Sequence, residues 1–128
     1  MADDPRRRLG AQGEELAARH LVARGYQIVE RNFRTRYGEL DLIAAGVECL
    51  VFCEVKTRVS RDSSSPLGPL ASVGARKRRH VRQIAREWLA AGRWELPGRL
   101  PELRFDAIGI TLDRNGRLLA LEHLEGAF

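Results

Sequence analysis

The chain lacks several features that would have assigned it to a familiar class of protein. Its only two cysteines, Cys49 and Cys53, would lie about 13 Å apart on one strand at ~3.3 Å per residue, too far for a disulfide bond. The three histidines have no zinc-site spacing to the cysteines. There is no glycine-rich phosphate loop, and no apolar run approaches the ~18 residues of a membrane span. These absences argue against a disulfide scaffold, a structural zinc site and a membrane protein.

Lysine is also scarce, because only Lys56 and Lys77 among the 22 basic residues are lysines. Where almost every cation is arginine, the remaining lysines are candidates for positions that need a compact ammonium group. The net charge of +5 and the pI near 10 favour a polyanionic partner such as nucleic acid. Biased codon composition, which enriches arginine and alanine, is the alternative explanation.

Length and composition are those of one soluble domain. A chain of 128 residues, 44% hydrophobic and 30% charged, can bury a sizeable core, so residues 1–128 are predicted to form a single domain. The arginines at positions 6 to 8 are not followed by an apolar run, so they do not begin a signal peptide. A cytoplasmic protein is therefore expected.

Hydrophobic periodicity predicts an α/β domain with a mixed central sheet. The expected order is α-β-β-β-α-β-β, with helices over residues 9–24 and 75–91 and strands at 26–33, within 38–58, at 103–112 and at 118–124. Residues 1–8 are predicted to be a flexible basic arm. Residues 59–74 are predicted to be a mobile loop, which either closes over a substrate or serves as flexible padding.

The stretch from residue 38 to residue 58 is predicted to be an antiparallel hairpin that carries unusual charge. A period of two puts Glu39 and Asp41 on one face of the first strand and Leu40 and Leu42 on the other. By the same rule, Glu54 and Lys56 share a face of the second strand. Burying such charge is costly unless something pairs with it, and a metal ion held by the carboxylates would do so.

Glu14 starts the core-facing stripe of the first predicted helix, ahead of Ala17, Ala18 and Leu21. Two interpretations remain open: a first-turn glutamate interacting with the helix N-terminus, or a fourth carboxylate aimed at the hairpin. Carboxylate oxygens are hard ligands that suit Mg²⁺ or Mn²⁺ rather than zinc. The candidate metal ligands are Asp41, Glu54, Glu14 and Glu39.

The second predicted helix carries the densest positive patch, with six basic residues between positions 76 and 86 and no acid among them. Lys77 continues its buried stripe at the first turn, so its ammonium points towards the sheet. The patch is either a solvated face or, beside the hairpin, a contact surface for a phosphate backbone. The candidate nucleic-acid contacts are Lys77, Arg78, Arg79, Arg82, Arg58 and Arg36. Arg104 and Asp106 share a strand face and are predicted to form a structural ion pair.

Two segments, Gly38-Glu-Leu-Asp41 and Phe52-Cys-Glu54-Val-Lys56-Thr-Arg58, resemble the Asp…Glu-X-Lys core of the PD-(D/E)XK nuclease superfamily. More narrowly, the chain is similar to the YraN-like family of predicted endonucleases, which is related to archaeal Holliday-junction resolvases. This likeness runs from Gly13-Glu14 through Asn32, the hairpin, Lys77 and Arg104-Phe-Asp106 to Glu125-Gly-Ala-Phe128. One departure is Leu40, which stands where the superfamily has proline.

The resemblance implies a restriction-endonuclease-like fold. It also implies Asp41 and Glu54 as metal ligands, Lys56 as the catalytic lysine and Glu14 as the helix-one glutamate of the resolvase branch. The leading hypothesis is therefore a magnesium- or manganese-dependent nuclease that acts on DNA, with branched or structured DNA as a candidate substrate. The alternative is a nucleic-acid-binding module that contributes to DNA processing without cutting. Because junction-resolving relatives work as symmetric dimers, a homodimer is also expected, with Trp94 and Leu96 as candidate contacts.

Overall fold

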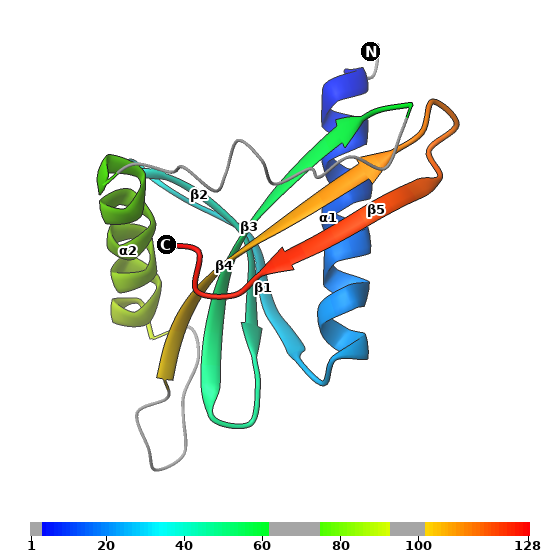
Figure 1. The fold of residues 1–128 in the computed structure, drawn as a ribbon. Helices are drawn as coiled ribbons and strands as arrows, with labels where there is room; N and C mark the ends of the chain where they lie inside the picture. The colour runs from blue at the N-terminus through cyan, green and yellow to red at the C-terminus, as the bar shows by residue number, and fades with distance from the viewer. Residues whose placement is uncertain (1–3, 62–74, 93–101) are drawn as a thin grey trace.

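A five-stranded sheet carries one long helix on each face (Figure 1). This computed structural model describes residues 4–61, 75–92 and 102–128, and only the backbone of residues 75–78. Neighbouring strands are antiparallel except for one central parallel pair, the third and fourth strands, which the second helix joins. The predicted order α-β-β-β-α-β-β is confirmed by α1 (Pro5–Ala23), β1 (Gln27–Thr35), β2 (Gly38–Ala45), β3 (Cys49–Val59), α2 (Ala75–Ala90), β4 (Glu102–Leu112) and β5 (Leu118–Leu124).

Helix α1 begins earlier than its apolar pattern predicts. Asp4 is the N-cap and accepts a hydrogen bond from the backbone N–H of Arg6, while Pro5 occupies the first turn, where a missing N–H costs nothing. Residues 5–8, predicted to belong to a flexible arm, are therefore helical, and that prediction was wrong. Of the predicted loop at 59–74, Val59 ends β3 and Ser60 bonds to Leu112, whereas residues 62–74 lie outside the described residues.

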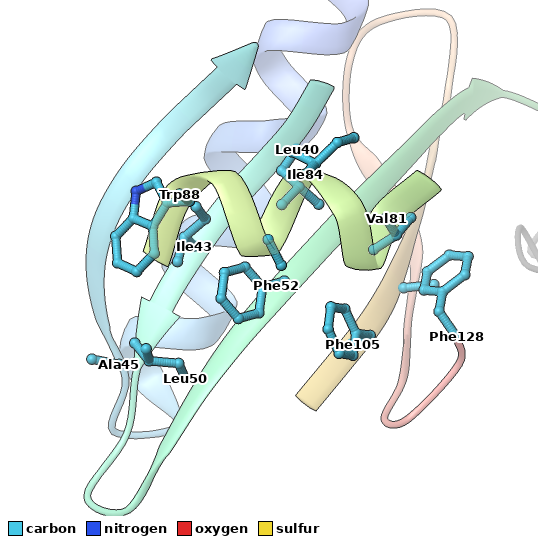
Figure 2. Close-up of a cluster of buried hydrophobic side chains, with 12 residues drawn as sticks. Leu40, Ile43, Ala45, Leu50, Phe52, Val81, Ile84, Trp88, Phe105 and Phe128 are labelled. Atoms are coloured by element: carbon cyan, nitrogen blue, oxygen red, sulfur yellow. The ribbon is translucent and has the colours of Figure 1, made fainter. Parts of the chain in front are cut away.

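Each helix buries its apolar stripe against a different face of the sheet. Beneath α1, buried Ala17, Ala18 and Leu21 belong to one cluster with side chains of β2, β3 and β4. Beneath α2, Trp88 and Phe105 both contact Phe52, the first edge to face and the second stacked (Figure 2). Within the described ranges, no helix is long and apolar enough to cross a membrane.

Gly13 lets α1 approach the sheet closely. A Cβ at this position would overlap the side chain of Thr57 on β3. We therefore expect Gly13→Ala to lower the free energy of unfolding by about 1–3 kcal/mol, the usual cost of overpacking. Gly10 on the same helix has nothing within 4 Å of the corresponding position, so Gly10→Ala should be neutral or slightly stabilising. Urea titration of both variants checks this, and equal effects would contradict it.

The β1–β2 hairpin reverses the direction in which its side chains face. Arg31 pairs with Leu42, which is buried on the α1 side, whereas Phe33 pairs with Leu40, which is buried on the α2 side. In a regular strand, residues two apart share a face. The prediction that Leu40 and Leu42 share a face was therefore wrong, because the strand is not regular at Asp41 between them.

The sheet forks next to this reversal. The β2–β3 ladder ends at the pair Leu42–Cys53, so residues 38–41 and 54–59, although in strands, do not pair with each other. In Figure 1 the tip of the β1–β2 hairpin extends towards α2, while β3 and β4 end, and β5 begins, on the side of the start of α1. Asp41 and Glu54 lie directly beyond the last pair, at the base of the fork.

A buried polar network ties α1 to β4 and β5. Asp106 is fully buried and accepts two hydrogen bonds from the guanidinium Nε and Nη2 of Arg104, each 2.9 Å long. His123 Nε2 lies 2.7 Å from the same carboxylate, and its Nδ1 lies 3.0 Å from Nε2 of His20 on α1. Arg104 also donates to the hydroxyl of Tyr26. The predicted Arg104–Asp106 ion pair is confirmed, and both cysteines are free as predicted.

Candidate metal centre

Three carboxylates converge beside the fork. Glu14 from α1 and Glu39 and Asp41 from β2 each offer an oxygen, and these oxygens all lie within 4.8 Å of one another. The close approach of α1 at Gly13 brings Glu14 to this place, next to the buried Ala17 and away from the first turn. Of the two interpretations left open for Glu14, the helix-terminus one is therefore wrong, and the structure places its carboxylate beside those of the hairpin.

Asp41 occupies the position where β2 leaves β3. Its Oδ2 accepts a 2.7 Å hydrogen bond from the backbone N–H of Val55, which takes the place of a ladder bond. Burial raises the pKa of Asp41 from 3.8 to about 7, because this hydrogen bond offsets only part of the burial and the charges of Glu14, Glu39 and Glu54 add to it. The ionised form of Asp41 is therefore unfavourable at neutral pH, and a cation bound beside it would stabilise that form.

Glu54 and Lys56 lie on one face of β3, as the spacing predicts. The register of β3 with β4 is unbroken from Cys49 to Val59, so its side chains alternate regularly, and both residues share the face of Phe52. Oε2 of Glu54 is buried, whereas Lys56 is exposed. The charge of Glu54 reaches Asp41 across the fork, although Glu54 lies outside the group of three. The fork thus brings together charges from both faces of the sheet.

Glu39 has two kinds of neighbour. Its Oε2 lies 3.3 Å from Nε of Arg34, whose side chain is 80% exposed. Its Oε1 lies 2.7 Å from the side-chain nitrogen of Asn32 when that amide is oriented to satisfy its hydrogen bonds. An exposed ion pair contributes little and leaves the carboxylate available. Glu39, predicted to be a metal ligand, therefore also has an arginine partner at the surface.

Burial also raises the pKa of Glu14, helped by the charge of Glu39 and opposed by a hydrogen bond from Asn32. Asn32 was not among the candidate site residues that the residue pattern supplied. Two signals were available: Asn32 is part of the family resemblance, and an asparagine is unfavourable inside a strand pattern.

The described arginines among the candidate nucleic-acid contacts differ in their burial and in the residues that they contact. Arg36 lies at the hairpin tip, where it donates to the hydroxyl of Tyr37 and covers its ring. Arg58 is partly buried and its Nε lies 3.5 Å from the Thr111 hydroxyl. Arg82, although exposed, bonds the Phe128 carbonyl oxygen and covers Phe105, so part of its role is structural.

Arg79 is exposed on α2. The side chains of Lys77 and Arg78 lie outside the described residues, as do Trp94 and Leu96, the candidate dimer contacts. The direction predicted for the Lys77 ammonium therefore stays a prediction.

The donor set fits a hard divalent cation. All the converging groups are carboxylates, which Mg²⁺ and Mn²⁺ prefer, and no cysteine or histidine is within the group of three. Like charges this close raise one another's pKa unless a cation neutralises them. Glu14, Glu39, Asp41 and Glu54 are the residues that would hold such an ion.

Cation binding should depend on pH because it competes with the proton on Asp41, whose pKa is about 7. We expect Mn²⁺ to raise the unfolding temperature clearly at pH 8 and little at pH 5.5. Binding at a hundred times Kd is worth about 2.7 kcal/mol. Thermal unfolding in Mn²⁺ or EDTA at matched ionic strength measures the difference. Equal shifts at both pH values would show that Asp41 does not take part.

The chain matches the model of a family described as "Uncharacterised protein family UPF0102" over residues 13–110. A UPF0102 protein from Parafrankia sp. (strain EAN1pec) is 46% identical over 121 residues, covering 94% of this chain and 96% of the relative. Another, from Rhodococcus jostii (strain RHA1), is 45% identical over 122 residues, covering 94% and 95%. A third, from Moorella thermoacetica, is 43% identical over 123 residues, covering 96% and 97%. The chain therefore belongs to the UPF0102 family.

Proposed function

We propose that this protein is a metal-dependent nuclease that hydrolyses phosphodiester bonds of DNA, with branched or structured DNA as the favoured substrate. The observation that carries the proposal is the meeting of Glu14, Glu39 and Asp41 within 4.8 Å at a fork of the sheet. The charge of Glu54 acts on the same place. The charges of Glu14, Glu39 and Glu54 each raise the free energy of ionising Asp41. If the carboxylates had no function, neutral residues in their places would make the protein more stable.

The residues of the site have separate tasks in this proposal. A Mg²⁺ or Mn²⁺ ion bound there would supply Lewis-acid chemistry to a phosphodiester oxygen. Asp41 is held in place by the Val55 N–H, so its orientation is set before any ligand arrives. Lys56, exposed on the face of Glu54, would orient the attacking water or neutralise the charge that develops on the phosphate.

Surface charge supports a nucleic-acid substrate. The net charge is +5, and described arginines at the hairpin tip and on α2 are exposed, including Arg34, Arg36, Arg79 and Arg86. Contacts between such cations and phosphates give affinity without sequence preference. The same cations also suit the second candidate function, a module that binds nucleic acid without cutting it.

A panel of labelled DNA forks, four-way junctions, duplexes and single strands separates the two candidate functions. Each substrate is incubated with the protein in Mg²⁺, Mn²⁺ or EDTA, and both binding and cleavage are measured. The nuclease proposal predicts cleavage only with metal. Binding that is equal in metal and in EDTA, with no cleavage, would favour the binding module. Absence of binding at low salt would contradict both.

A further inference from the structure

Asn32 has an unusual backbone conformation in the middle of β1. Its φ is 51°, and it is the only residue other than glycine with a positive φ in the described ranges. Asparagine tolerates this left-handed conformation better than other non-glycine residues. A residue with such a φ cannot continue a regular strand, so β1 must change direction here.

The change of direction coincides with the reversal of the hairpin. The pairs Arg31–Leu42 and Phe33–Leu40 flank it on opposite faces, and no pair joins Asn32 to Asp41 between them. Asp41 is thereby released from β1 and bonds the backbone of Val55 on β3. The positive φ of Asn32 and the separation of Asp41 from β1 therefore belong to one local distortion of the hairpin.

The side chain of Asn32 adds a second link to the site. In the amide orientation that satisfies its hydrogen bonds, the nitrogen donates to Oε1 of Glu39 at 2.7 Å and to Oε2 of Glu14 at 3.1 Å. One neutral amide therefore joins carboxylates from β2 and α1 that would otherwise repel. Each bond uses one oxygen of its carboxylate. The other oxygen of Glu39 lies 3.3 Å from Nε of the exposed Arg34.

We infer that Asn32 is the positioning residue of the carboxylate site: its left-handed backbone turns Asp41 towards β3, and its amide fixes Glu14 and Glu39 before a cation binds. This inference rests on the proposed function, because it assigns Asn32 to the same metal centre. Partners that orient metal ligands without touching the metal commonly change metal affinity about 10- to 100-fold when removed.

The bridging amide can be tested without metal. The two side-chain amide protons of Asn32 donate to different carboxylates, and each proton gives its own resonance in NMR spectra of the metal-free protein. We expect Glu39→Ala to shift one of these resonances and Glu14→Ala to shift the other. If neither resonance moves in either variant, the amide does not bridge the carboxylates and the inference is overturned.

The effect on the site is measured by Mn²⁺ titration at pH 8, followed by electron paramagnetic resonance. In Asn32→Gly, glycine adopts the positive φ of this position freely, so the variant loses the side-chain amide without straining the backbone. The matched control is Asn115→Gly, which removes an exposed asparagine from the β4–β5 turn. We expect Asn32→Gly to weaken Mn²⁺ binding about tenfold and Asn115→Gly to leave it unchanged, with both proteins folded by circular dichroism.

The outcomes separate the inference from the function on which it rests. If wild type and Asn32→Gly bind Mn²⁺ equally, the positioning role is overturned while the metal site stands. If wild type itself binds no Mn²⁺, the metal site of the proposed function is overturned, and the inference fails with it. A loss of folded protein alone would leave Mn²⁺ affinity per folded molecule unchanged, which also counts against a positioning role.

Discussion

Asp41→Asn is expected to stop metal-dependent DNA cleavage and, at the same time, to stabilise the metal-free protein. Removing one oxyanion-hole donor from an enzyme typically costs about 10²–10³ in rate, and we expect the loss of a metal-binding carboxylate to cost at least as much. An asparagine Oδ1 can still accept the Val55 N–H bond, so the backbone at the fork should be preserved. Single-turnover cleavage and thermal unfolding of the same preparations measure the two effects.

The stabilising part follows from the raised pKa. An unfolded Asp41 ionises near 3.8 and the folded one near 7, so between these values the folded state holds a proton that the unfolded state has lost. The contribution of Asp41 to stability is therefore full below pH 3.8 and is lost as the pH rises through about 7. The neutral amide side chain of the variant has no such loss, so its advantage should be greatest at pH 8 in EDTA.

Asp113→Asn is the matched control, since Asp113 also accepts backbone N–H bonds, from Asn115 and Arg117, but in the β4–β5 turn. It should leave cleavage unchanged. Asp41→Asn protein that is both inactive and less stable would mean that Asp41 is mainly a structural acid. Undiminished cleavage would remove Asp41 from the site.

Asp106→Ala is expected to have the largest effect on stability. The variant leaves the guanidinium of Arg104 and the ring of His123 without their shared buried acceptor, and such a loss typically costs about 3–5 kcal/mol. Burial alone would raise the pKa of Asp106, but hydrogen bonds from His123, Arg104 and the Gly126 N–H outweigh it and hold the pKa below 3.8. Urea unfolding at pH 7 measures the difference.

The pH dependence gives this prediction a second test. Because the pKa of Asp106 is depressed, its contribution is full above pH 3.8 and fades as the pH falls through the lower folded-state value. Wild type and variant should therefore converge in strong acid. Glu15→Ala, which removes an exposed partner of Arg19 and Arg31, is the control and should change stability little. A small effect of Asp106→Ala at pH 7 would contradict the structural role of the network.

The order of helices and strands was predictable because each element carries its own pattern. The apolar stripe of α1 is buried through Ala17, Ala18 and Leu21, and that of α2 through Val81 and Ile84. The start of α1 was missed because the arginines of its first turns carry no apolar signal, and the helix begins at a capping aspartate and a proline.

The site was predictable only in part. The carboxylates stand out because charge at alternating strand positions is unusual, and Glu14 because it continues a buried stripe. The reversal at Asn32 was not predictable, since the period-two rule assumes an unbroken strand. The contact of His20 with His123, 103 residues apart, carries no local signal at all.

The central claim, that the carboxylate site and Lys56 together hydrolyse DNA, is tested most directly by single-turnover cleavage of one labelled DNA fork. Wild type is compared with Lys56→Ala and with Arg117→Ala, which removes another exposed cation, from the β4–β5 turn. Both variants lose one positive charge, so DNA binding should fall alike. We predict that wild type and Arg117→Ala cut in Mn²⁺ and not in EDTA, while Lys56→Ala does not cut. Cleavage that survives in Lys56→Ala, or in EDTA, would contradict the claim.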